Sequence, residues 1–119
     1  MSLKLLVTLS ENDVAPRFDL TTEVLIASFR EDGSVDRTRT VVLAHASAED
    51  LCQLILTEGI DVVVCGGIEQ EYFDYLAWKK VRLLDSVMGP WERALECFRE
   101  EGLKPGTILI DRSERTSHD

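Results

Sequence analysis

The sequence predicts a single domain of the α/β class, in which one mixed sheet carries helices on its faces. Two observations support this prediction. The first half of the chain holds three apolar segments separated by turn residues, and the second half alternates short apolar segments with segments of helical spacing. A chain of 119 residues is long enough for one hydrophobic core and too short for two. We therefore assign residues 1–104 to one domain and residues 105–119 to a C-terminal extension.

Five segments are predicted to be strands. The first is dense in Leu and Val, which is typical of a strand buried on both faces. Asp32-Gly33 is a strong hairpin signal between the second and third strands. The third strand is expected at a sheet edge, where Arg37 and Arg39 discourage pairing with another chain. The predicted strands span residues 3–9, 23–30, 35–43, 61–66 and 81–84.

Three segments are predicted to be helices. Ser47 followed three residues later by Asp50 resembles a capping box, and the first helix should stop at Gly59. The second helix is expected over residues 69–79, with acidic residues in its first turn. Gly89-Pro90 opens the third helix and Gly102 ends it, since proline suits a first turn and glycine a helix end.

The order of these elements restricts the topology. Right-handed crossovers place the fourth predicted strand parallel to the first, and the hairpins make the second antiparallel. Counting the predicted strands, the sheet order is 3-2-1-4-5, which is the ribonuclease-H-like arrangement. In the extension, the apolar segment 107–110 is costly to leave in water. We expect it to form an edge strand, either in its own sheet or in that of a second copy, which would make a homodimer.

Composition excludes several classes of function. With 13 Lys+Arg against 22 Asp+Glu, the net charge of −9 argues against nucleic-acid binding. The apolar runs are too short to cross a membrane, and the start of the chain does not look like a signal peptide. Three cysteines without C-x-x-C spacing argue against a disulfide framework, so a cytoplasmic location is expected.

Catalytic motifs are not found in the sequence. No Ser–His–acid arrangement and no H-E-x-x-H motif can be identified. A nuclease of ribonuclease-H-like shape would place an acidic residue in the middle of the first strand, and residues 4–9 contain none. We therefore expect a protein that is not an enzyme.

Three stretches of the chain together resemble the dinitrogenase iron–molybdenum cofactor biosynthesis family. The first stretch has an apolar strand, then Ala15-Pro16-Arg17-Phe18, then a second apolar strand. The other two are Gly-Ile-Asp-Val-Val-Val-Cys-Gly-Gly-Ile at 59–68 and Trp-Glu-Arg-Ala-Leu-Glu-Cys-Phe at 91–98. The resemblance covers residues 3–103. The chain departs from the family in its short Ala44-His45-Ala46-Ser47 loop and in its C-terminal extension.

This resemblance implies a function. Members of the family include nitrogenase accessory proteins that hold an iron–sulfur or iron–molybdenum cluster in transit. The leading hypothesis is therefore a non-enzymatic binding or carrier module for such a cofactor, or for a related anionic ligand, with cluster-assembly proteins as partners. The alternative is a regulatory or protein-interaction domain that binds no cofactor.

The end of the fourth predicted strand supplies the first candidate site residues. Ligand crevices in open α/β sheets lie beyond the carboxyl ends of strands, which is where Cys65 is expected. A Cys65 thiolate, stabilised by the following helix, could ligate iron, but a small buried residue is the alternative. The amides of Gly66 and Gly67 could contact an anion, or the two glycines could simply permit a tight turn.

Two further candidates lie in loops. His45 could join Cys65 as a metal ligand, although an exposed loop histidine is the alternative. The guanidinium of Arg17 could hold an anionic cluster, or it could tie its own loop down through backbone carbonyls or Asp19. Phe18 is expected to be an apolar plug that seats this loop.

Overall fold

A mixed sheet forms the centre of the molecule, in a computed structural model that describes residues 3–109. The strands have the order β4-β3-β1-β5-β6, and a short strand, β2, pairs with β1 off this path. A 3₁₀ turn at Phe18–Leu20 precedes β3. The strands are β1 (Leu3–Ser10), β2 (Asp13–Val14), β3 (Glu23–Phe29), β4 (Val35–Val42), β5 (Val62–Val64) and β6 (Arg82–Leu84). The helices are α1 (Ala48–Thr57), α2 (Gln70–Trp78) and α3 (Trp91–Glu100).

The pairing of the five longer strands agrees with the prediction. β3 is antiparallel to both β1 and β4, whereas β5 is parallel to β1 and to β6. The sequence did not predict β2, which folds back on β1 and pairs Leu9 with Val14. Residues 10–13 look like a simple turn in sequence, because a two-residue strand is too short to show a periodic pattern. Glu11, with φ 57°, makes the reversal tight enough for pairing.

Local signals set the boundaries of the hairpin and the helices. Gly33, with φ 88°, turns the chain between β3 and β4, and the Arg30 amide donates to the Ser34 carbonyl at 2.8 Å. Ser47 caps α1, because its hydroxyl accepts a hydrogen bond from the Asp50 amide at 3.1 Å. Pro90 is the cap residue of α3, one position before the helix begins. Among residues 3–109, no helix is long and apolar enough to cross a bilayer.

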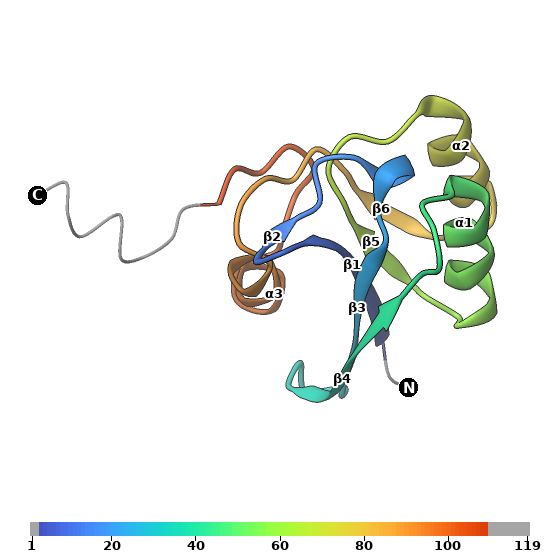
Figure 1. Cartoon of the computed structure of the whole chain (residues 1–119). Coiled ribbons are helices and arrows are strands. Elements are labelled where there is room, and N and C mark those ends of the chain that lie inside the picture. Colours follow the sequence, from blue (N-terminus) through green and yellow to red (C-terminus); the bar gives the residue numbers. More distant parts are fainter. Residues whose placement is uncertain (1–2, 110–119) are drawn as a thin grey trace, which may run out of the picture.

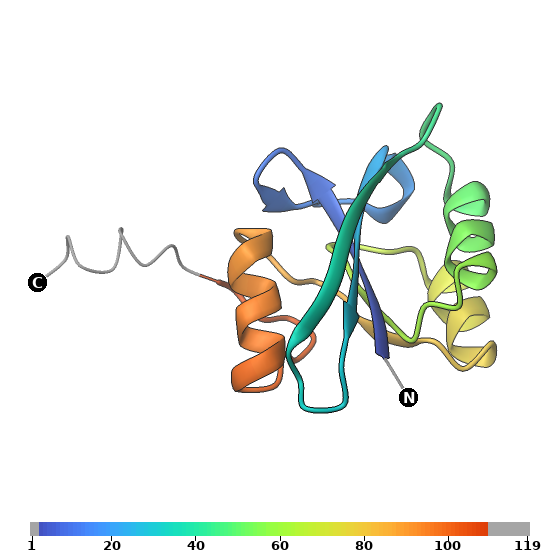
Figure 2. The same ribbon diagram turned by 90° about the horizontal axis from the view of Figure 1, so that it is seen from below.

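The helices form a layer on each face of the sheet. Figure 2 shows α3 on one side and α1 and α2 together on the other. Successive residues of β1 point to opposite faces, so Leu5 and Val7 belong to the core under α3 while Leu6 belongs to the core under α1 and α2. Both faces of β1 are buried, as predicted. β1 lies between β3 and β5 in the middle of the sheet, and its carboxyl end leads into β2 (Figure 1).

The start of the C-terminal extension packs against the segment after β6. The Met88 amide donates to the Thr107 carbonyl at 3.0 Å, and the Leu109 amide donates to the Met88 carbonyl at 2.8 Å. Leu109 is buried, whereas Ile108 is 70% exposed. The pairing partner is thus a loop segment rather than a strand of the sheet. Ile110 and the rest of the extension lie outside the described residues, so the domain boundary and the homodimer stay predictions.

Candidate functional site

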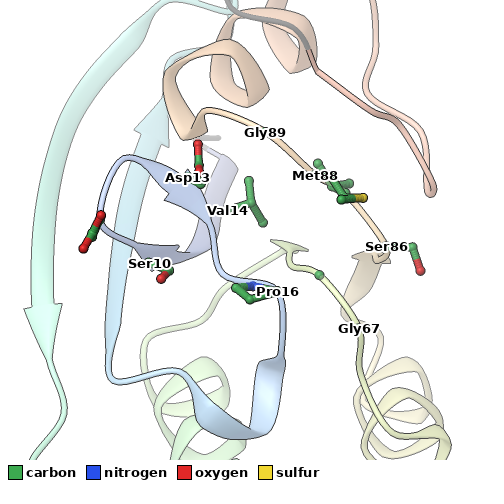
Figure 3. A pocket seen from close by; sticks show the side chains of 11 residues that line it. Ser10, Asp13, Val14, Pro16, Gly67, Ser86, Met88 and Gly89 are labelled. Atoms are coloured by element: carbon green, nitrogen blue, oxygen red, sulfur yellow. The ribbon is translucent and has the colours of Figure 1, made fainter.

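A cleft of about 550 Å³ opens beyond the carboxyl ends of β1, β5 and β6. Figure 3 shows Val14 and Pro16 on one side of it and Ser86 and Met88 on the other. Three segments of the chain form its walls: the turn and short strand after β1, the glycine pair after β5, and the segment after β6. The lining residues are Ser10, Glu11, Asp13, Val14, Pro16, Gly66, Gly67, Ser86, Val87, Met88 and Gly89.

Backbone hydrogen bonds join these walls. The Val14 amide donates to the Gly89 carbonyl at 2.8 Å, and the Ser86 amide donates to the Gly66 carbonyl at 2.8 Å. Gly89, with φ 115°, lies so close to the C-terminal segment that a Cβ there would sit 2.7 Å from the Leu109 carbonyl oxygen. The shape of the cleft therefore depends on backbone contacts rather than on mobile side chains.

The two glycines after β5 contact the loop that follows β2. The Gly66 amide donates to the Ala15 carbonyl at 3.1 Å, and the Gly67 amide donates to the Pro16 carbonyl at 2.8 Å. The Phe18 amide returns a hydrogen bond to the Gly67 carbonyl at 2.8 Å. In this conformation both amides already have carbonyl acceptors, so neither is free to contact an anion. Gly66 permits close backbone approach instead.

Cys65 lies at the carboxyl end of β5, as expected, but beneath the site rather than in it. Its side chain is 0% exposed and packs in the core under α1 and α2, together with Phe18. Burial raises the pKa of the Cys65 thiol to about 12, and the nearby Asp85 carboxylate adds to the shift. In this conformation the side chain is therefore a neutral, buried thiol at physiological pH, which is the alternative that the sequence left open beside a thiolate ligand.

His45 does not come near Cys65 in the sheet. It follows β4, and β3 and β1 lie between β4 and β5. Its imidazole is 70% exposed and lies 3.3 Å from the Asp50 carboxylate. Across residues 3–109, no group of three or more His, Cys, Asp or Glu side chains is placed to hold a metal ion. His45 and Cys65 therefore do not form a shared metal site in this arrangement.

Arg17 lies beside the cleft, where its backbone bridges to Gly67. Its guanidinium donates to both carboxylate oxygens of Asp19, at 3.1 and 2.7 Å. In this conformation Arg17 therefore ties down its own loop through Asp19, which is one of the two roles that the sequence allowed. The side chain is still 59% exposed and lines a second hollow of about 320 Å³, with which the cleft shares Ser10, Glu11 and Pro16. Phe18 is 1% exposed and seats the loop in the core.

The sequence did not point to Glu11, Asp13, Ser86 or Met88 as residues of the site. Their position depends on β2 and on the chain segment after β6, neither of which gives a periodic signal in the sequence.

Two residues that line the cleft, Glu11 and Ser86, adopt left-handed backbone conformations, with φ 57° and 58°. Such conformations are uncommon outside glycine and concentrate at functional sites.

The arrangement defines the class of protein: an α/β domain with a ligand-sized cleft at the carboxyl edge of its central parallel strands. No known family model and no curated protein sequence matches the chain. Solved structures do match it, at low sequence identity. These matches show the fold.

Three of these structures span nearly the whole domain. The protein PH0822 is 16% identical, with a TM-score of 0.75, and the match covers 92% of this chain and 96% of that one. A Methanocaldococcus jannaschii protein, MJ0327, provisionally described as a dinitrogenase, is 17% identical with a TM-score of 0.71, over 87% and 94% of the two chains. A Thermotoga protein, TM1290, provisionally described as a NifB protein of the DUF35 family, is 15% identical with a TM-score of 0.65, over 92% and 97%.

Proposed function

We propose that this chain is a non-enzymatic binding module that acts in the biosynthesis of a nitrogenase-type cofactor and holds an iron–sulfur or iron–molybdenum cluster as cargo. The observation that carries the proposal is the cleft at the carboxyl ends of β1, β5 and β6, where α/β sheets of this kind bind ligands. The fold is shared with structures whose descriptions name a dinitrogenase and a NifB protein. We propose that the domain is a nitrogenase accessory factor of the ribonuclease-H-like class.

In the conformation described above, the loop after β2 is bonded to Gly66 and Gly67, and Cys65 is buried. This loop must move away before cargo can reach Cys65. The Ala15 and Pro16 carbonyls must release the amides of the two glycines. The Phe18 amide must also leave the Gly67 carbonyl, and the Phe18 side chain must leave the core that it shares with Cys65. Three hydrogen bonds at about 0.5–1.5 kcal/mol each and one buried aromatic side chain at about 1.5–3 kcal/mol give a cost of about 3–7.5 kcal/mol. A typical domain is stabilised by ~5–15 kcal/mol, so the open loop is a rarely populated local state that cargo would have to stabilise.

Opening would present three groups at once. The freed amides of Gly66 and Gly67 could donate to an anionic cluster, and Cys65 would lose the cover that keeps its thiol neutral. The exposed guanidinium of Arg17 could exchange Asp19 for the cargo. His45 lies too far along the sheet to be needed. A carrier that binds through one soft ligand and a few charge-assisted contacts can also release its cargo.

Anaerobic reconstitution tests this function. The purified chain is mixed with an iron–sulfur or iron–molybdenum cluster, and its charge-transfer absorption is followed after gel filtration. Cys65→Ala and Arg17→Ala should each lower the retained absorption. Cys97→Ala is the matched control, because Cys97 lies on α3 across the sheet. Equal retention by all three variants would remove the proposed site, and no uptake by the parent chain would reject cluster binding.

The charge of the cleft favours a second candidate, a protein-interaction domain without a cofactor. The charged side chains that line the cleft are Glu11 and Asp13, and both are acidic. At its rim Met88 is 60% exposed and bridges to the exposed Ile108. An acidic cleft beside exposed apolar side chains suits a protein partner better than an anionic cluster. Absence of cluster uptake by the parent chain would favour this candidate.

A further inference from the structure

A further concave surface lies between α1 and α2. These two helices cover the face of the sheet opposite to α3 (Figure 1). This α1–α2 groove has a volume of about 420 Å³ and shares no lining residue with the cleft. Residues of both helices line it, with the buried Cys52 at its floor. The lining residues are Glu49, Cys52, Gln53, Glu71, Tyr72 and Tyr75.

Exposed aromatic side chains extend the groove along α2. Trp78 is 72% exposed and Tyr75 is 40% exposed, and their ring centroids lie 6.3 Å apart. Tryptophan is a large apolar residue that is well buried on average, and it is enriched at the energetic centres of protein interfaces. The Lys79 ammonium lies 4.9 Å from the Trp78 centroid and 5.8 Å from that of Tyr75. These ring faces therefore already bind a cation.

The two helices that line the groove carry acidic side chains and no basic ones, and Lys79 and Lys80 follow directly after α2. Within their bounds α1 and α2 contain four carboxylates and no Lys or Arg. On α2, Glu71, Asp74, Tyr75 and Trp78 occupy positions i, i+3, i+4 and i+7, which form one stripe along the helix. The Tyr72 hydroxyl donates to Glu49 across the groove at 3.2 Å and fixes that carboxylate at the rim. The surface is thus both aromatic and acidic.

We propose that the α1–α2 groove is a docking site for an amphipathic segment of a partner protein that carries Lys and Arg. An apolar side chain of the segment would enter the groove above Cys52, between the two tyrosines. Its cations would pair with Glu49 and Glu71, and one of them would replace Lys79 over the Trp78 ring. Charge complementarity selects this partner: the acidic stripe repels anionic lipid surfaces and nucleic-acid phosphates. The proposal is independent of cargo in the cleft.

The test uses a synthetic helical peptide of Leu, Ala, Lys and Arg, amphipathic and positively charged, titrated into the full chain by calorimetry. A charge-reversed peptide with Glu in place of every Lys and Arg is the ligand control. We expect the basic peptide to bind, with affinity that falls as salt rises, and the reversed peptide not to bind. Trp78→Ala should weaken binding about tenfold or more.

Matched variants distinguish binding in the groove from attraction to the overall negative charge of the protein. Glu49→Gln with Glu71→Gln should weaken binding and flatten its salt dependence. Glu92→Gln with Glu100→Gln removes the same charge from α3 on the other face and should leave the affinity unchanged. Met88→Ala, at the cleft, should also leave it unchanged. No binding by the parent chain, equal binding by Trp78→Ala, or equal loss in the α3 variant would each overturn the proposal.

Discussion

Gly66 lies against Pro16 so closely that a Cβ on residue 66 would sit 2.5 Å from the Pro16 carbonyl oxygen. No real Cβ tolerates that distance, so the glycine is what allows the loop after β2 to seat on the end of β5. The same loop carries Phe18 into the core that buries Cys65. This pair of backbone segments therefore sets the shape of the cleft and holds the loop against that core.

Gly66→Ala should destabilise the protein, because its methyl group would meet the Ala15 and Pro16 carbonyls and force the loop to shift. Overpacking of this kind typically costs about 1–3 kcal/mol, measurable as a lower midpoint of urea unfolding. Gly67→Ala is the control. A Cβ there would lie 3.5 Å from the Pro16 oxygen, an ordinary contact, so its midpoint should hardly change. Equal effects would contradict the role given to Gly66.

Cys65 should resist alkylation in the folded protein. Its pKa is raised to about 12 by burial, so at pH 8 its thiol is neutral as well as inaccessible. Cys97 is only partly buried and should be the first cysteine that iodoacetamide modifies. Mass spectrometry of digests taken over time gives the order. Labelling of Cys65 at the rate of Cys97 would show that the loop is open most of the time.

The turn between β3 and β4 should weaken in acid. Ser34 donates hydrogen bonds to the Asp32 carboxylate from its hydroxyl and its amide, and these lower the pKa of Asp32 below its ordinary 3.8. Because the folded-state pKa is depressed, the contribution of this carboxylate is present above the unfolded pKa. It is lost as the pH falls through the folded pKa. NMR titration should give a higher Asp32 pKa in Ser34→Ala; an unchanged value would refute this cause.

Leu109→Ala should destabilise the domain, whereas Ile108→Ala should not. Leu109 is 9% exposed and packs in the core under α3, while its neighbour is 70% exposed. Truncation of a buried leucine costs about 2–5 kcal/mol, and a surface substitution changes stability by less than about 0.5 kcal/mol. Thermal unfolding of the two variants makes the comparison. A small effect at both positions would mean that the C-terminal segment does not hold the cleft wall.

The sheet order could be predicted because it depends on signals that a sequence carries locally. Asp32-Gly33 fixes one hairpin, and the chirality of crossovers fixes the parallel strands. The site was harder to predict. Cys65 continues the alternation of Val63 toward the core under α1 and α2, so its side chain points away from the cleft that its neighbours line. The sequence also could not show that Gly66 lies against the backbone of Ala15 and Pro16, because a contact between distant segments leaves no local pattern.

The segment after β6 has a consequence for how the protein is made. It accepts a hydrogen bond from β2 through Gly89, and it exchanges two with residues 107 and 109 through Met88. One wall of the cleft thus joins β2 to residues 107–109. During synthesis from the N-terminus, every residue that lines the cleft leaves the ribosome before residues 107–109, which hold Met88 in place. A chain that terminates before residue 107 would therefore keep the residues that line the cleft and lose two hydrogen bonds that fix one of its walls.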